Sequence, residues 1–337
     1  MINTIPAMMQ AVVLEEEGGP LILRQRPVPQ PGQGEVLVRM AASPINPSDL
    51  GYLRGMGETK RPLPAVPGIE GSGTVVAIGP GAIARFMLGR RVACGRKFNR
   101  DGAWAEYMVT SAVQCIPLQK SVPMELGSML IVNTMTVVIF LDRIKKEGHK
   151  AVVNTAAASQ LGQLLVRLSH KHGFNLINIV RRKEQAETLR ALGATHVLVS
   201  AEPDFDQKLG MLTRELNATL VLEAIGGDFT QHLIDASPDG SVILFYSNLS
   251  TEPARIRPNS IYNHGRRVEG FYLAPWAAKN GIFKVLQVAL RAQDLLRTDA
   301  QFTIHKRIPL SAAQEGLESY QKNMSAGKVL FVMDSQI

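Results

Sequence analysis

Hydrophobic positions in the first third of the chain occur in short runs. Between about residues 8 and 125, apolar runs such as AVVLEE, GEVLVRMAAS and GSGTVVAIG alternate with Pro and Gly turns such as PVPQPGQG. Short strands separated by turn residues are typical of an irregular, mostly antiparallel β domain. We therefore expect a β-rich domain in this part of the chain.

The hydrophobic pattern changes after about residue 125. A helical stretch, MLIVNTMTVVIFLDRI, is followed by strand-like runs that alternate with amphipathic helical runs: KAVVNTA, LGQLLVRLSHKHG, NLINIV, KEQAETLRALG and onward to GSVILFYS. This alternation, to about residue 265, predicts βαβ units in a parallel, doubly wound sheet. The remaining residues return to a mixed pattern, so the predicted fold class is α/β.

Length and composition narrow the class of protein. A chain of 337 residues suggests two domains rather than one. Its apolar runs fall short of the roughly 18 residues that a membrane span needs, so we expect no membrane partner. The N-terminal residues show neither a basic leader nor an apolar signal stretch, and Cys94 and Cys115 are the only cysteines. We expect a cytoplasmic protein in a reducing compartment.

The charge balance is basic, with 37 basic and 29 acidic residues and a net charge of +8. Its basic clusters are short, as in RRK at 181–183 and RIKK at 143–146, and no basic tail or aromatic-interleaved stripe accompanies them. The charge therefore suits an acidic cofactor or simple solubility better than nucleic acid.

The stretch AVVNTAAASQLGQLLVRLSHKHG resembles the first strand, turn and helix of a dinucleotide-binding fold that has lost most of its glycines. The glycine positions of G-x-G-x-x-G hold Ala157, Ser159 and Gly162. The remaining glycine lets helix pack closely on strand. Ser159 offers a hydroxyl to a phosphate oxygen, and a helix beginning near Leu161 supplies N–H groups and a positive dipole. Phosphate binding remains open, although a purely structural strand, turn and helix would share this pattern.

The end of the next predicted strand, NLINIVRRKEQ, favours one nucleotide over the other. At this point an acid favours the ribose 2′-hydroxyl of NAD, whereas an Arg favours the 2′-phosphate of NADP. The sequence places Arg181 and Arg182 there, with no acid before Glu184. Two arginines at a strand end also suit a solvated surface, but beside the preceding turn they favour NADP(H) as the cofactor.

Several landmarks together resemble the medium-chain dehydrogenase/reductase superfamily over nearly the whole chain. They are PINPSDLGYLRG (44–55), LPAVPGIEGSGTVVAIG (63–79), GAWAEYMV (102–109), VNTMT (132–136), RALGATHVL (190–198) and GKVLF (327–331). The resemblance implies a GroES-like β-rich domain, residues 1–125 and 266–337, and a Rossmann nucleotide-binding domain, residues 126–265. It also makes a homodimer the expected assembly, with the strand GSVILFYSNL and the helix GIFKVLQVALRAQDLL as its apolar surfaces.

The zinc-binding members of this superfamily differ from the chain at their metal ligands. They carry a Cys where this chain has Ser43 and Pro44, and a His where it has Ile69, and they contain a four-cysteine lobe that is missing here. Zinc needs several N, S or O ligands that converge on one point. We therefore expect no metal, and the likeness is to the zinc-free branch of NADPH-dependent quinone reductases and enoyl thioester reductases.

The resemblance implies a set of cofactor-binding residues around a nicotinamide, a pyrophosphate and an adenosine phosphate. They are Asn46 and Thr136 beside the nicotinamide; Ala157, Ser159, Gln160 and Leu161 at the pyrophosphate; Arg181, Arg182 and Ser200 at the adenosine phosphate; and Ile225, Tyr246, Phe271 and Leu273 toward the nicotinamide end.

The candidate catalytic residues are Asn46, Tyr52 and Tyr246. The enoyl thioester reductases carry a proton-donating Tyr where this chain has Gly57 or its neighbour, and Tyr52 lies several residues earlier. Tyr246 stands where the family usually has Gly, so its phenol could narrow the nicotinamide site, bind a substrate carbonyl or simply pack. Asn46 and Tyr52 have structural explanations too, since an Asn-Pro-Ser-Asp stretch favours turns and caps.

Three functions follow from these residues. The first is NADPH-dependent reduction of a quinone or another small electrophilic alkene or carbonyl, in which the protein stabilises the charge that develops on oxygen. The second is reduction of a trans-2-enoyl thioester of CoA or a carrier protein. The third is a protein that binds NADPH without turnover, because the turn glycines and the donor Tyr are both replaced.

Overall fold

The computed structural model describes residues 5–55, 62–250, 252–300 and 302–333. The chain forms two compact units, one of Met1–Met135 with Ile282–Ile337 and one of Thr136–Gly281. Both boundaries come later in the chain than the expected 125 and 265. Residues 124–135 pack on strands of the first unit, and residues 267–270 form a strand of the second unit's sheet, which explains the two differences.

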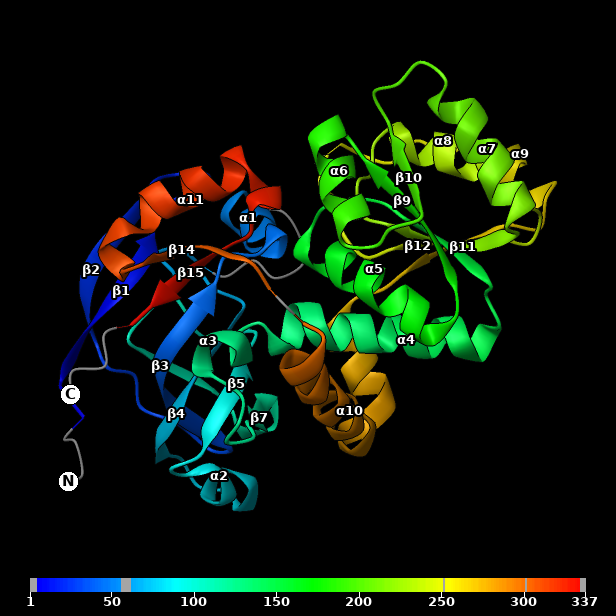
Figure 1. Cartoon of the computed structure of the whole chain (residues 1–337). Coiled ribbons are helices and arrows are strands. Elements are labelled where there is room, and N and C mark those ends of the chain that lie inside the picture. Colours follow the sequence, from blue (N-terminus) through cyan, green and yellow to red (C-terminus); the bar gives the residue numbers. More distant parts are fainter. Residues whose placement is uncertain (1–4, 56–61, 251, 301, 334–337) are drawn as a thin grey trace. The chain divides into compact units, whose positions relative to one another are not determined.

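The first unit is built on β-sheets, as its short apolar runs predict (Figure 1). Strands β1 (Met8–Leu14) and β2 (Leu21–Pro27) form an antiparallel pair. A seven-stranded sheet has the order β14-β15-β3-β4-β5-β7, and β6 also pairs with β3. Its strands are β3 (Glu35–Pro44), β4 (Glu70–Ile78), β5 (Arg91–Gly95), β6 (Tyr107–Ser111), β7 (Cys115–Pro117), β14 (Ile304–Ile308) and β15 (Lys328–Val332). Only the β14 and β15 pair is parallel.

Short helices connect these strands. They are α1 (Pro47–Leu53), α2 (Ala82–Met87), η1 (Ala112–Gln114), α3 (Met124–Gly127), η3 (Leu310–Ala312), α11 (Ala313–Lys322) and η4 (Met324–Ala326). The segment η2 (Leu130–Met135) is a π-helix, a rare form that is frequent at functional sites. The core of this unit includes Trp104 and Phe331, whose ring centroids are 5.1 Å apart.

The second unit confirms the predicted doubly wound sheet. Six parallel strands lie in the order β10-β9-β8-β11-β12-β13. They are β8 (Ala151–Asn154), β9 (Asn175–Val180), β10 (His196–Val199), β11 (Ala218–Glu223), β12 (Val242–Phe245) and β13 (Arg267–Gly270). Because the chain leaves β8 in one direction and returns to β11 on its other side, the carboxyl ends of β8 and its neighbours form the edge where such sheets bind nucleotides.

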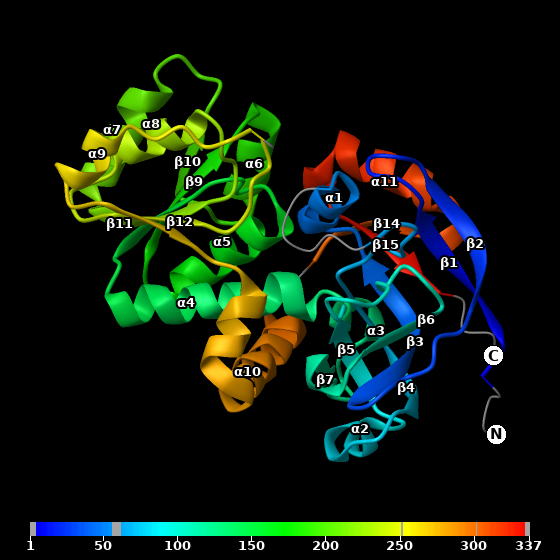
Figure 2. The ribbon, with the colours of Figure 1, turned by 180° about the vertical axis from the view of Figure 1, so that it is seen from behind.

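Helices cover both faces of this sheet (Figures 1 and 2). They are α4 (Thr136–Glu147), α5 (Gln160–His172), α6 (Lys183–Ala191), α7 (Phe205–Glu215), α8 (Phe229–Ala236) and α9 (Pro258–Tyr262). Apolar residues of α7 and α8 form one core cluster with residues of the strands. Right-handed crossovers place α5 and α6 on the opposite face. Helix α10 (Leu273–Thr298) is broken at Gly281, whose φ of 74° suits glycine.

The prediction that the strand GSVILFYSNL forms an apolar surface for subunit contact is wrong. Its central residues form β12, which hydrogen-bonds to β11 on one side and β13 on the other, and Val242, Ile243 and Leu244 are buried. Its hydrophobicity reflects a position inside a parallel sheet that is covered on both faces. The strand with an open edge at this end of the sheet is β13.

Candidate functional site

The turn between β8 and α5 keeps its shape without the missing glycines. The Thr155 N–H donates to the Leu222 carbonyl on one side and the Ala157 N–H donates to the Ile179 carbonyl on the other, at 3.1 Å each. Ala156 supplies the left-handed backbone, with φ of 48°, that glycine would adopt more easily. The turn is therefore held by both neighbouring strands.

Ser159 is the N-cap of α5. Its Oγ accepts the Gly162 N–H at 3.1 Å, which leaves the hydroxyl hydrogen available to donate. The helix begins at Gln160, beside the predicted Leu161, and the first N–H groups of a helix have no intrahelical acceptor. Ala157, Gln160 and Leu161 are themselves buried, so their contribution to a phosphate would come from the backbone.

Gly162 makes the close contact that the sequence predicts for the third glycine. A Cβ at this position would clash with the Ala157 carbonyl oxygen and would lie 2.7 Å from the Ala157 Cα. Both atoms belong to the backbone and have little freedom to move. The turn therefore tolerates Ala157 and Ser159 in glycine positions but requires glycine at 162.

The predicted adenosine-phosphate residues come together at the ends of β9 and β10. The Ser200 N–H donates to the Val180 carbonyl at 2.8 Å, so Ser200 lies directly beside the end of β9. Arg181 and Arg182 follow Val180, and both are exposed. Their backbone N–H groups donate to the Gln185 side chain at 3.2 and 3.1 Å, which fixes the backbone at the end of β9.

The predicted nicotinamide-end residues lie at or just beyond the ends of β11, β12 and β13. Ile225, Tyr246, Phe271 and Leu273 are all half-buried. The Phe271 N–H donates to the Phe245 carbonyl at 2.7 Å, and the Tyr246 N–H donates to the Glu223 carbonyl at 3.0 Å, so adjacent strand ends continue their pairing. Thr136, also predicted near the nicotinamide, is the first residue of α4 and is buried.

Glu223, the last residue of β11, adds a buried carboxyl group to this edge. Its Oε1 accepts the N–H groups of Ile225 at 3.0 Å and Gly226 at 2.6 Å. Its Oε2 has no hydrogen-bond partner among the described residues. Burial raises the pKa of Glu223 to about 7, against the opposing effect of these N–H groups. The carboxyl group therefore exchanges a proton near neutral pH.

Asn46 belongs to a buried polar network in the first unit. Its Nδ2 donates to Glu70 Oε1 at 2.9 Å, and its Oδ1 accepts from Asn133 Nδ2 at 3.3 Å and from Lys328 Nζ. Its backbone N–H donates to Asp49 Oδ2 at 2.8 Å. All of these residues are buried. The polar atoms of the Asn46 side chain thus bond within the protein.

Glu70 connects this network to the π-helix. Its Oε2 accepts the N–H groups of Ile131 at 3.1 Å and Val132 at 2.9 Å. Burial raises the pKa of Glu70 to about 7 and the pKa of Asp49 to about 6, whereas burial lowers the pKa of Lys328 to about 8. Two ionised carboxylates and one ammonium would leave this buried network with a net negative charge. Protonation of one carboxyl group brings the network closer to neutrality, which an apolar interior favours.

Tyr52 lies on α1, and its ring is covered by the Arg96 guanidinium at 4.5 Å from the ring centroid. The side chain is buried in the core of the first unit. Packing and the cation contact account for this position. The other predicted donor position, Gly57, lies outside the described residues.

The residues present do not fit a zinc site. Ser43 donates its hydroxyl to the Glu70 carbonyl at 2.7 Å, and burial raises the pKa of the Cys94 and Cys115 thiols, that of Cys115 to about 12. Across the described part of the chain, no three His, Cys, Asp or Glu side chains come together to hold a metal ion. The same part contains no helix with the length and apolar character of a membrane span.

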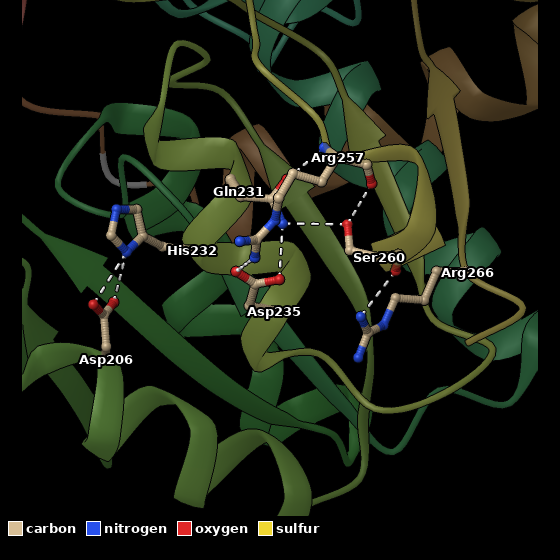
Figure 3. Close-up of polar contacts among 7 residues, drawn as sticks. All are labelled: Asp206, Gln231, His232, Asp235, Arg257, Ser260 and Arg266. Carbon is tan, nitrogen blue, oxygen red and sulfur yellow. Dashed lines mark hydrogen bonds and ion pairs between the residues drawn. The ribbon is translucent and has the colours of Figure 1, made fainter. Parts of the chain in front are cut away.

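A second polar cluster in the nucleotide unit connects α8 to the segment around α9 (Figure 3). Arg257 Nη2 contacts Asp235 at 2.5 Å, His232 Nδ1 lies 2.9 Å from Asp206, and Gln231 accepts the Arg257 N–H at 2.7 Å. Arg266 donates to the Ser260 carbonyl at 3.0 Å. The contacts of Arg257 fasten the segment around α9 to α8, whereas the pair of His232 and Asp206 joins α8 to α7.

The sequence patterns did not identify Glu70, Asn133, Glu223 or Lys328 as site residues. A signal was present for two of them, because Lys328 precedes the apolar run VLFV and Glu70 follows PGI at the start of a strand. A charged residue at the start of a buried strand needs a partner. The identity of that partner depends on the fold, since Glu70 and Lys328 are far apart in sequence.

Two family models match the chain in order. Residues 32–120 match the alcohol dehydrogenase GroES-like domain, and residues 161–288 match a model described as zinc-binding dehydrogenase. Among solved structures, a Mesorhizobium loti protein described as a candidate NADPH:quinone reductase is 32% identical, with a TM-score of 0.92, and the match covers 98% of this chain and 99% of that one. A mycobacterial protein in complex with NADPH is 23% identical, with a TM-score of 0.82 over 96% and 99% of the two chains, a likeness of fold.

Curated relatives carry a different name. The mitochondrial enoyl-[acyl-carrier-protein] reductase of Arabidopsis thaliana is 28% identical over 79% of this chain and 72% of its own length. The human protein of that name is 25% identical over 97% of this chain and 90% of its own length. The predicted family and fold are confirmed: the chain belongs to the medium-chain dehydrogenase/reductase superfamily, in its zinc-free branch of oxidoreductases.

Proposed function

We propose that the protein is an NADPH-dependent oxidoreductase that reduces a quinone or another small, electron-poor alkene or carbonyl compound. The observation that carries the proposal is the pair of exposed arginines at the end of β9, beside a turn in which Ser159 caps the N-terminus of α5. The description of the similar M. loti protein as a candidate NADPH:quinone reductase supports this class of acceptor.

The order of strands supports an extended cofactor along the carboxyl edge of the sheet. Arg181, Arg182 and Ser200 lie at the ends of β9 and β10, and the Ser159 turn follows β8. Tyr246 follows β12, on the other side of β8. Three strand spacings separate β9 from β12, about 14 Å, a span that an extended dinucleotide bridges. Adenosine phosphate, pyrophosphate and nicotinamide would thus follow one another along this edge.

Each group of residues has a separate task in this arrangement. Arg181 and Arg182 would bind the 2′-phosphate, and Ser159 with the first N–H groups of α5 would bind the pyrophosphate. Ile225, Tyr246, Phe271 and Leu273 would surround the nicotinamide, which supplies the hydride when the cofactor is bound. Gly162 keeps the helix close enough for its N–H groups to reach the phosphate.

In the first unit, we propose that Asn46 acts as a positioning residue and that Tyr52 acts as a packing residue. The Asn46 side chain bonds to Glu70, Asn133 and Lys328, so it holds the start of α1 and the π-helix in place. The proton that completes reduction of a quinone can come from water, because a hydroquinone anion is basic. This acceptor class therefore needs no tyrosine donor at the position of Gly57.

Reduction of an enoyl thioester is the second candidate. The curated relatives named enoyl-[acyl-carrier-protein] reductase favour it, and the net charge of +8 suits the phosphates of CoA or of a carrier protein. NADPH oxidation that depends on crotonyl-CoA and is absent with quinones would favour this candidate over the first. Binding of NADPH without turnover on either acceptor would favour the third, a nucleotide-binding protein without catalysis.

The decisive experiment is calorimetric titration of the protein with NADPH and, separately, with NADH. We expect tighter binding of NADPH, and we expect Arg181→Ala and Arg182→Ala each to weaken NADPH binding by about tenfold or more while NADH binding changes little, because a charge-assisted bond contributes roughly 1.5–3 kcal/mol. Arg190→Ala, an exposed arginine near the end of α6, is the matched control. Equal binding of both nucleotides by all variants would contradict the role of the arginines.

We also propose a homodimer in the cytoplasm. Strand β13 has an open edge with Val268 exposed, and Phe283 on α10 is 87% exposed, so both elements leave apolar surface uncovered. The buried free thiols of Cys94 and Cys115 suit a reducing compartment. Light scattering at micromolar concentration should report twice the chain mass of 36.8 kDa, and a monomer would contradict the assembly.

A further inference from the structure

Tyr246 is an oriented side chain at the carboxyl edge of the sheet. Its ring meets Phe140 of α4 edge to face, with centroids 5.3 Å apart and ring planes at 73°. Phe140 is almost fully buried and makes a similar contact with Phe271, at 5.1 Å and 68°. Such contacts restrict the ring to one orientation. The position of the phenol is thus set by the fold before any ligand binds.

The hydroxyl of this tyrosine is unsatisfied in the described part of the chain. It makes no hydrogen bond with the residues that the structure describes, and the side chain is half-buried. Its oxygen is not one of the fully buried polar atoms that lack a partner, so the hydroxyl is accessible to water or to a ligand. Burial and the Glu223 carboxylate raise the pKa of Tyr246, so the group keeps its proton and remains a donor at physiological pH.

The place of Tyr246 in the strand order decides which ligand its hydroxyl can meet. It lies at the end of β12, on the side of β8 opposite the arginines that follow β9. The nicotinamide end of a cofactor held by those arginines would lie on this side. An acceptor must approach the nicotinamide to receive a hydride, so its oxygen comes to the same part of the edge.

We propose that the Tyr246 hydroxyl donates a hydrogen bond to the carbonyl oxygen of the acceptor; the inference rests on the proposed function and extends it to a residue with a defined task. When hydride bonds to a carbon of the acceptor, the electron pair of the conjugated double bond moves onto this oxygen. The resulting enolate then takes one proton from water, which completes the reduction. Tyr246 keeps its own proton throughout and stabilises the charge as it develops.

The test is Tyr246→Phe, which removes the hydroxyl and keeps the ring contacts with Phe140. NADPH oxidation is followed with 1,4-naphthoquinone and with methyl vinyl ketone, and NADPH binding is measured by calorimetry. We expect kcat to fall by about 10- to 100-fold for both acceptors, because the lost bond strengthens only as charge develops. The KM for each acceptor and the Kd for NADPH should change less than about threefold.

The control is Tyr262→Phe, which removes a hydroxyl from a side chain that is 71% exposed, and we expect no change in either measurement. Wild-type activity in Tyr246→Phe would overturn the inference alone. A tenfold weaker NADPH binding in that variant would also overturn it, because the hydroxyl would then bind the cofactor. A wild-type protein that binds NADPH but reduces neither acceptor would overturn the proposed function and this inference together.

Discussion

Functional polar side chains are buried and bonded in the first unit of the chain but lie at an accessible sheet edge in the second. In the first unit, the buried Asn46 bonds to both Glu70 and Lys328, which are buried as well. In the second unit, the arginines after β9 are exposed and the Tyr246 hydroxyl lacks a partner among the described residues. A side chain that is already bonded in the interior positions its neighbours, whereas one exposed at a sheet edge can meet a ligand. Substitutions in the first unit should therefore affect stability most, and those at the edge of the second should affect binding.

The largest effect is expected for Lys328→Met, which removes the only ammonium that contacts Asn46 in the described network. Two buried carboxyl groups would lose their compensating charge, which typically costs about 3–5 kcal/mol in the free energy of unfolding. Lys328→Arg should keep the charge and recover part of that loss. Chemical denaturation monitored by circular dichroism measures these differences.

The loss in Lys328→Met should also depend on pH. In the native protein the pKa of Asp49 is about 6 and that of Glu70 about 7, both above their ordinary values. The folded state therefore binds more protons than the unfolded state, and stability falls as pH rises through this window. Without the ammonium both pKa values rise further, so destabilisation should be larger at pH 7.5 than at pH 5. Equal losses at both pH values would contradict this account.

A neighbouring lysine provides the control for this substitution. Lys306 lies on β14, beside β15, and its Nζ is 3.6 Å from the Glu315 carboxylate at the surface. Surface ion pairs contribute little, so Lys306→Met should change the free energy of unfolding by about 0.5 kcal/mol or less. A comparable loss in both variants would show that burial of the charge does not cause the effect.

The difference between the units also explains what the sequence could predict. Hydrophobic periodicity predicted the parallel sheet, since each strand and helix carries its own local pattern, and the turn after β8 could be identified although only Gly162 remained. The network of Glu70 and Lys328 could not, because Asn46 joins these two residues only after β15 pairs with β3 and β3 with β4. The interior position of β12 was likewise missed, since a continuous apolar run has the same appearance inside a sheet and at an interface.

A smaller effect on stability than that of Lys328→Met, and a direct test of the turn, is expected for Gly162→Ala. The added Cβ would lie 2.7 Å from the Ala157 Cα, so the helix must move away from the turn. Overpacking of this kind costs about 1–3 kcal/mol, partly offset by the roughly 1 kcal/mol by which alanine favours a helix over glycine. NADPH affinity should fall by about tenfold or more, because the N–H groups of α5 would move with the helix. Gly210→Ala in α7 is the matched control, since the three atoms nearest to its Cβ would all belong to the flexible Arg214 side chain, the first at 3.2 Å. That variant should gain stability and bind NADPH normally. Unchanged NADPH binding in Gly162→Ala would mean that the helix N-terminus does not hold the phosphate.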